Sequence, residues 1–129
     1  MGKPAANASS TVVATDTHII MVPAVVPIPT PMPNPFNGTL NGGLVSTVNI
    51  GGQPAAVLGS TAQNTPHIPT GGPFMVPPKN QATIMIGSST VMIGGKPAAR
   101  MGDTALTCND PADLPIGQVV ATGTVMIGG

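Results

Sequence analysis

Short apolar stretches, each followed by Gly-Gly and then by Pro-Ala-Ala, dominate the pattern of hydrophobic and polar positions in this chain. Residues 46–50 (STVNI) and 89–93 (STVMI) both alternate β-branched side chains with other residues and both end at Gly-Gly. Alternation at period two predicts half-buried strands, and Gly-Gly predicts a tight turn because glycine accepts positive φ. The proline that follows lacks an N–H, which suits the first residue or the edge of a strand. Each unit therefore predicts strand, turn and strand, and no stretch has useful helical periodicity.

The unit recurs along the chain. Residues 46–62 and 89–105 align without gaps at an offset of 43 residues. A third copy begins at residues 123–129 (GTVMIGG) and stops where Lys-Pro-Ala-Ala would follow, whereas residues 1–11 (MGKPAANASST) supply that missing half. We therefore expect one domain, residues 1–129, in which both termini lie side by side and three units close into a ring-like, pseudo-three-fold arrangement.

Three Pro/Gly-rich segments, residues 19–43, 66–81 and 109–117, connect the units. The first has a proline at every second position, which predicts extended, polyproline-like backbone; these are Pro27, Pro29, Pro31, Pro33 and Pro35. The segments could be solvent loops, or ordered arms along the strand core, since long structureless loops are uncommon in compact domains. The fold class we expect is all-β: a small conical domain of short β-hairpins with long connecting arms.

Composition narrows the possible partners. Charged residues are only 6% of the chain, against the usual quarter, so we expect a partner to cover part of this neutral surface. Four basic residues and two aromatic ones are too few to bind nucleic acid. Pro23 and Pro27 interrupt the apolar stretch 19–28 and no basic stretch precedes it, so we expect no signal peptide.

The inventory of catalytic groups is small. The chain has no Glu, and its four carboxylates are Asp16, Asp103, Asp110 and Asp113. Asp110 and Asp113 lie beside prolines, where turn formation explains them better than a pair for acid-base catalysis. No nucleophile-elbow or phosphate-loop motif occurs. We therefore expect a protein without enzymatic activity.

His18, His67 and Cys108 are all the histidines and cysteines of the chain. They follow the proline of their own unit's Pro-Ala-Ala by 14, 13 and 11 residues, respectively. Any one of them alone would be an ordinary core or surface residue. Three equivalent positions converge near a three-fold axis, however, and two imidazoles with one thiolate suit Zn²⁺. The sequence leaves the fourth ligand open among water and three asparagines, Asn34, Asn64 and Asn109.

Two other functions fit some of these features. Three ligands and a water would suit a small zinc-dependent hydrolase with an open metal site, although no general base or substrate pocket is evident. A free-standing adhesin or β-solenoid module would need a short uniform period, which the 43-residue offset does not provide.

The residues IGGKPAARMGDTA (93–105), with full Pro-Ala-Ala-Arg at 97–100, closely resemble the PAAR-repeat family. Residues 54–57 (PAAV) and 4–7 (PAAN) are degenerate copies. The resemblance implies a small cone that caps and sharpens the trimeric, β-helical spike of a contractile injection machine, one monomer per trimer. Such machines include type VI secretion systems, extracellular injection particles and phage-like tails.

The resemblance also implies one structural zinc ion near the apex, with His18, His67 and Cys108 at the matching positions. Family members often use three histidines and one cysteine, and Asn34 stands where some relatives place a further histidine. It implies a protein of the bacterial cytoplasm that is later delivered outside the cell or into a target cell, pierces a membrane transiently, and can serve for attachment of a separate effector.

The alternation within the repeated strands predicts two sets of side chains on opposite faces, one of which fills the core. The first set is Val48, Ile50, Val91, Ile93, Val125 and Ile127. Their neighbours Asn49, Met92 and Met126 would face the opposite way.

Overall fold

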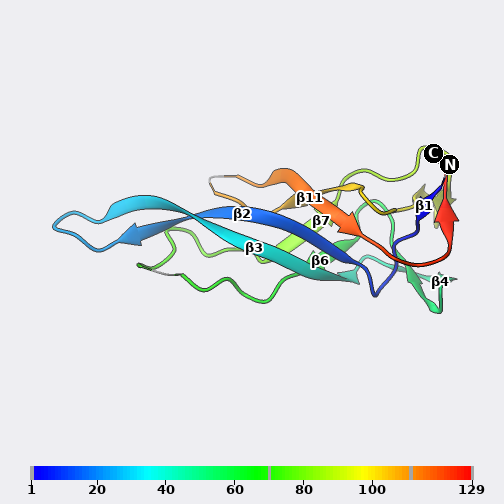
Figure 1. Cartoon of the computed structure of the whole chain (residues 1–129), viewed down its shortest axis with the longest axis horizontal. Helices are drawn as coiled ribbons and strands as arrows, with labels where there is room; N and C mark the ends of the chain where they lie inside the picture. Colours follow the sequence, from blue (N-terminus) through cyan, green and yellow to red (C-terminus); the bar gives the residue numbers. More distant parts are fainter. Residues whose placement is uncertain (1, 70, 111, 129) are drawn as a thin grey trace.

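The structure, a computed structural model, describes residues 2–69, 71–110 and 112–128. Across these residues it is all-β, with no helix and so none that could cross a bilayer. This confirms the predicted fold class. The molecule is elongated, with β1 and β12 side by side at one end and the turn between β2 and β3 at the other (Figure 1).

Six strands form a closed barrel in the order β10-β11-β2-β3-β6-β7. They are β2 (Thr11–Val22), β3 (Ile28–Gly42), β6 (Thr61–Gln63), β7 (Gln81–Ile84), β10 (Thr104–Thr107) and β11 (Leu114–Val120). Each unit contributes one antiparallel pair: β2–β3, β6–β7 and β10–β11. The barrel is filled by small and aliphatic residues with a single phenylalanine, Phe36, which is 2% exposed.

Three short hairpins close the broad end of the molecule. They are β4 (Val45–Ile50) with β5 (Gln53–Ala55), β8 (Met92–Ile93) with β9 (Lys96–Pro97), and β1 (Lys3–Pro4) with β12 (Met126–Ile127). Their registers are equivalent, since the isoleucine before Gly-Gly is opposite the residue before proline in all three. The two ends of the chain thus form the third hairpin, although Met1 and Gly129 themselves lie outside the described residues.

The second alanine of each Pro-Ala-Ala lies in a ring of three hydrogen bonds. Ala6 N–H donates to Ala99 O at 3.0 Å, Ala99 N–H to Ala56 O at 3.0 Å, and Ala56 N–H to Ala6 O at 3.1 Å. All three residues are fully buried. Because three backbones meet in this ring, a side chain larger than a methyl group would overpack it. The motif therefore encodes the closure of the three units.

The turn after each Pro-Ala-Ala is also repeated. In each unit a side-chain oxygen accepts a hydrogen bond from the backbone N–H three residues earlier: Ser10 from Asn7 at 3.0 Å, Ser60 from Val57 at 2.9 Å, and Asp103 from Arg100 at 2.7 Å. The backbone carbonyl of the same acceptor residue then receives an N–H from the barrel, from Leu40, Ile84 and Val119 in turn. The pseudo-symmetry thus extends from the end hairpins into the barrel.

The proline-rich first connection differs from the expectation. Residues 29–35 were predicted to be extended and polyproline-like, but they lie in β3. Each of them is paired with a residue of β2. Pro29, Pro31 and Pro33 are opposite Met21, Ile19 and Thr17, whose own backbone groups bond away from β3. The prolines therefore occupy the pairs that exchange no ladder hydrogen bonds, where a missing N–H costs nothing. Much of the predicted arm is consequently a long hairpin.

Of the two alternating sets on the end hairpins, the set that contains the isoleucines contributes to the core. Ile50 and Ile127 are buried and pack with Ala5, Ala55 and Ala98 in a second small core. Val48 and Val125 of the same set stay outside it, because they are 37% and 43% exposed. They precede the paired residues of their hairpins, where the ladder shifts or has not begun.

Candidate metal centre

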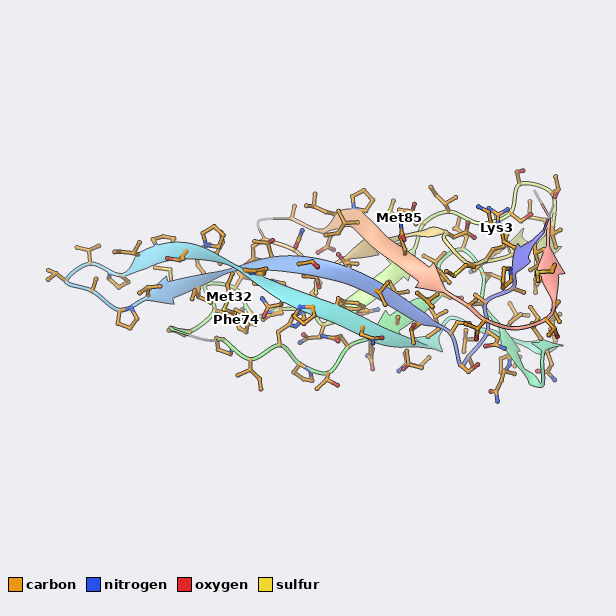
Figure 2. The ribbon with its side chains drawn as sticks, in the orientation of Figure 1. Lys3, Met32, Phe74 and Met85 are labelled. Atoms are coloured by element: carbon orange, nitrogen blue, oxygen red, sulfur yellow. The ribbon has the colours of Figure 1, made fainter. Side chains whose placement is uncertain are left out.

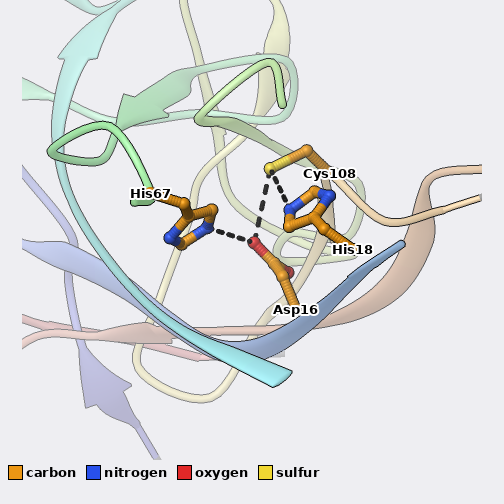
Figure 3. A group of neighbouring side chains, drawn as sticks. All are labelled: Asp16, His18, His67 and Cys108. Carbon is orange, nitrogen blue, oxygen red and sulfur yellow. Dashed lines mark hydrogen bonds and ion pairs between the residues drawn. The ribbon is translucent and has the colours of Figure 1, made fainter. Parts of the chain in front are cut away.

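Four side chains from three segments converge in one cluster inside the molecule (Figure 3). Asp16 and His18 both come from β2, where residues two apart share a face. Cys108 directly follows β10, and His67 lies in the segment after β6. One potential ligand atom from each lies within 4.8 Å of all the others. The three residues predicted from their spacing are thus brought together, and a fourth group joins them.

The distances suit a single small cation. Asp16 Oδ2 lies 3.3 Å from Cys108 Sγ and 3.4 Å from His67 Nε2, and Cys108 Sγ lies 3.8 Å from His18 Nε2. Bond lengths of about 2.0–2.3 Å in tetrahedral zinc sites place neighbouring ligand atoms about 3.3–3.8 Å apart. The four groups could therefore hold a metal ion with little rearrangement.

Asp16 is the residue that the sequence reasoning missed. The period-two rule could have found it, because Asp16 must share the face of His18 on any strand that contains both. The three asparagines considered as fourth ligands have other partners. Asn34 Nδ2 donates to Met32 O, Asn109 Oδ1 accepts from Thr17 N–H, and Asn64 Nδ2 contacts His67 Nδ1 at 3.3 Å.

Burial makes a bound cation favourable here. Asp16 is fully buried, yet its Oδ1 has no hydrogen-bond partner among the described residues, and neither does His18 Nδ1. A buried carboxylate without a cationic partner is costly. The ionisable contacts of Asp16 are Cys108 Sγ and His67 Nε2, which lie 3.3 and 3.4 Å from its Oδ2. The donor set of two nitrogens, one sulfur and one oxygen fits Zn²⁺ and leaves no need for a water ligand.

The Cys108 thiol is held in its neutral form when no metal is bound. Burial raises its pKa to about 11, and the nearby charge of Asp16 and the hydrogen bond to it act in the same direction. The thiol then donates to Asp16 Oδ2. A divalent cation would reverse this balance, because coordinated thiols are deprotonated.

The surrounding residues orient both histidines. Asn64 contacts His67 Nδ1, and the Asp110 carboxylate lies 3.7 Å from His18 Nδ1. Carboxylates and amides in such positions commonly fix the orientation of metal-binding imidazoles. The only two aromatic side chains of the chain add packing: Phe74 meets the His18 ring edge-on at 5.8 Å between centroids, and Phe36 meets His67 at 6.4 Å.

A cleft opens beside His18 and Cys108 and is lined by Lys79, Asp110 and Asp113. Lys79 Nζ donates to Asp113 Oδ2 at 2.8 Å, and this contact raises the pKa of Lys79. Asp110, for which a turn role was predicted, bonds instead to β2: its Oδ2 accepts from Ile19 N–H and its own N–H donates to Thr17 O. The cleft offers a polar entry route toward the four-residue cluster.

Comparison with known families gives one match. A family model described as "PAAR motif" matches residues 36–112 and, in a second overlapping match, residues 76–129. No curated protein and no solved structure is similar to the chain at a significant level.

Proposed function

Because this chain belongs to the PAAR-motif family, we propose that it is a structural spike-tip protein. It caps and sharpens the trimeric, β-helical spike of a contractile injection machine, such as a type VI secretion system, an extracellular injection particle or a phage-like tail. In this proposal it has a mechanical role in piercing a target envelope and carries out no catalysis.

One observation carries the proposal: a single chain presents three equivalent hairpins around a closed three-fold ring of hydrogen bonds. A trimer offers three identical sites about one axis, and only a partner with matching symmetry can engage all three at once. Exposed uncharged side chains of the end hairpins form what we call the end surface: Val48, Asn49, Met92, Val125 and Met126. Lys3 and Lys96 are the exposed charged side chains of the same hairpins. A surface in which uncharged side chains predominate suits a stacked, desolvated contact.

The four-residue cluster has a structural part in this proposal. We assign it one zinc ion, with His18, His67, Cys108 and the added Asp16 as ligands. When bound, the ion ties together three segments that have little core of their own. Four protein ligands are typical of structural zinc, whereas catalytic zinc keeps an open position. The donor set therefore favours the spike-tip function over a zinc-dependent hydrolase.

The remaining expectations follow from the same proposal. The protein would assemble with the spike in the bacterial cytoplasm, and firing would deliver it outside the cell or into a target cell. A separate effector could attach to it and travel with the particle.

Binding to the cognate spike trimer tests the proposal. We expect the wild-type chain to bind and the double variant Met92→Asp/Met126→Asp to lose binding at least tenfold, because two carboxylates would have to be desolvated in the contact. Leu114→Asp/Ile116→Asp is the matched control, since it places the same two charges on exposed positions of β11. Absence of binding by the wild-type chain, or equal loss in the control, would refute the proposal.

A further inference from the structure

The β2–β3 hairpin has one covered edge and one open edge. On the outer edge of β2, Met21 N–H donates to Pro73 O and Met75 N–H donates to Ile19 O, so a neighbouring segment engages both kinds of backbone group. On the outer edge of β3, no strand of the described chain pairs with residues 28–36, because the pairing with β6 lies beyond them. One long edge of the hairpin therefore faces outward without a strand beside it.

The open edge presents acceptors and no donors. Four exposed prolines of β3 lie in the pairs that exchange no ladder hydrogen bonds with β2, so their backbone groups point outward. These are Pro29, Pro31, Pro33 and Pro35. Because proline has no N–H, residues 29–35 contribute a row of outward carbonyl oxygens and not one outward N–H group.

The same strand carries other residues where it has a neighbour. Asn37 and Thr39 continue the series of outward positions, and neither of them is proline. Asn37 N–H donates to Asn64 Oδ1 at 3.1 Å, and Thr39 is paired with Gln63 of β6. Prolines thus occupy the outward positions that have no partner and stop where a partner begins. This distribution indicates that they act on the open edge of β3 and not on its pairing with β2.

Two copies of such an edge cannot pair with each other. Ordinary strand edges satisfy each other because each one offers both N–H and C=O groups. Two edges that offer only acceptors would place carbonyl against carbonyl, without a hydrogen bond between them. Each carbonyl would also lose its water, which costs free energy when no donor takes the place of that water. Edge-to-edge contact between two copies of this chain is therefore unfavourable.

Charged side chains commonly protect an open strand edge, but β3 has none. No Asp, Glu, Lys or Arg occurs between Asp16 and Lys79, and the formal net charge of the chain is zero. Figure 2 shows Lys3 near the end of the molecule opposite the hairpin. The exposed side chains near the turn of the hairpin include the apolar Val25, Val26 and Ile28. An uncharged, partly apolar edge of this length would associate if it also had free N–H groups.

We propose that the outer edge of β3, residues 28–36, is a self-association site that its prolines keep closed. The partner they exclude is a second copy of this chain, paired edge to edge through β3. The inference goes beyond the proposed function, because it concerns the free protein before it meets any other component. It assigns to the proline series the task of keeping the chain monomeric.

Restoring the outward N–H groups tests the proposal. The variant Pro29→Thr/Pro31→Thr/Pro33→Thr adds three donors at pairs that exchange no ladder bonds with β2, so the hairpin keeps its own hydrogen bonds. In analytical ultracentrifugation at increasing concentration, the mass of this edge variant should approach twice that of the monomer. Hydrogen exchange at the amides introduced at positions 29, 31 and 33 should slow by roughly tenfold or more, and only in the dimer.

The matched control, Pro66→Thr/Pro69→Thr/Pro77→Thr, replaces three exposed prolines that lie outside the strands. We expect the control and the wild type to remain monomeric over the same concentrations. Pro31→Thr alone adds one donor, and it should dimerise more weakly with the same local protection. This single variant keeps the test decisive where the triple variant does not fold. No spike is present in these measurements, so their result is independent of the proposed function.

Five outcomes would overturn the proposal. The first three are a folded edge variant that stays monomeric, a dimer whose introduced amides exchange as fast as in the monomer, and equal association of the control. The fourth is a wild-type chain that dimerises through residues 28–36. The fifth is a Pro31→Thr protein that fails to fold, because the proline would then serve the pairing of β3 with β2.

Discussion

Lys3 and Ile127, which lie near opposite ends of the chain, are paired directly across two antiparallel strands. The same relationship joins Lys96 to Ile93 and Gln53 to Ile50 across intact Gly-Gly turns. The third pair thus reproduces, without a covalent connection between its strands, what the other two hairpins achieve with a tight turn. The ring of three units is therefore closed by noncovalent contacts between the two ends of the chain.

Deleting residues 123–129 should cost both folding and metal binding, although no candidate ligand lies near them in sequence. The deletion removes β12, the buried side chain of Ile127 and the carbonyl of Val125 that accepts from Ala5 N–H. We expect thermal unfolding at a clearly lower temperature and loss of bound zinc by elemental analysis. A variant with the same length and a Gly/Ser sequence at 123–127 controls for chain length and should behave like the deletion. A truncated protein that folds and retains zinc would contradict the closed ring.

The buried ion pair of one unit should be replaceable by its neutral counterpart from another. Arg100 and Asp103, which are 6% and 3% exposed, stand where Val57 and Ser60 stand in the second unit. Asp103→Ser alone should destabilise the fold by about 3–5 kcal/mol, because it leaves a buried guanidinium without its carboxylate. The double variant Arg100→Val/Asp103→Ser should recover most of this loss, since it copies the Val57–Ser60 turn.

Chemical denaturation of the two variants measures the free energy of unfolding in each case. Equal destabilisation of the single and the double variant would show that the units are not interchangeable at this turn. It would thereby count against the pseudo-three-fold equivalence drawn from the hydrogen bonds.

Asp16→Asn should have opposite effects on the two forms of the protein. In the metal-free form it removes a fully buried carboxylate whose Oδ1 lacks a partner, so stability should stay equal or rise. In the presence of zinc it replaces an anionic ligand with a weaker neutral one, so affinity should fall, by roughly tenfold or more. Asp113→Asn is the control, since it neutralises a carboxylate outside the cluster. Unchanged zinc affinity in Asp16→Asn would exclude Asp16 as the fourth ligand.

Zinc affinity should increase with pH. Burial raises the pKa of Cys108 to about 11, so the thiol is protonated at neutral pH and must lose its proton when the metal binds. Each unit of pH should then strengthen binding about tenfold through this residue up to that pKa. In the metal-free protein the raised pKa gives stability below about pH 9, which is lost as pH rises toward 11. Competition with a chromophoric chelator measures the affinity, and Cys108→Ser should flatten the slope.

Much of the fold could be predicted because the three copies of the sequence repeat make equivalent hydrogen bonds. Pro-Ala-Ala recurs where three backbones meet, and its alanines must be small for that reason. The strand nature of residues 29–35 could not be predicted from the prolines alone. These residues form a strand because β2 lies beside them and makes its ladder hydrogen bonds only with the residues between the prolines. The sequence of residues 29–35 alone does not reveal this pairing.

The candidate site was predictable to a similar extent. His18, His67 and Cys108 could be grouped because each occupies nearly the same position after its unit's Pro-Ala-Ala. Asp16 could not be predicted from the repeats, because only one unit has a potential ligand two residues before its histidine or cysteine. Asp16 lies beside His18 because residues two apart on a strand share a face, and not because of the symmetry of the units.

The stoichiometry of the complex with the cognate spike shows whether one chain imitates three-fold symmetry to cap a trimer. Native mass spectrometry of the purified complex gives this ratio in one measurement. We predict one copy of this chain for three spike subunits. Three copies for each trimer, or a stable complex with a spike monomer, would contradict it.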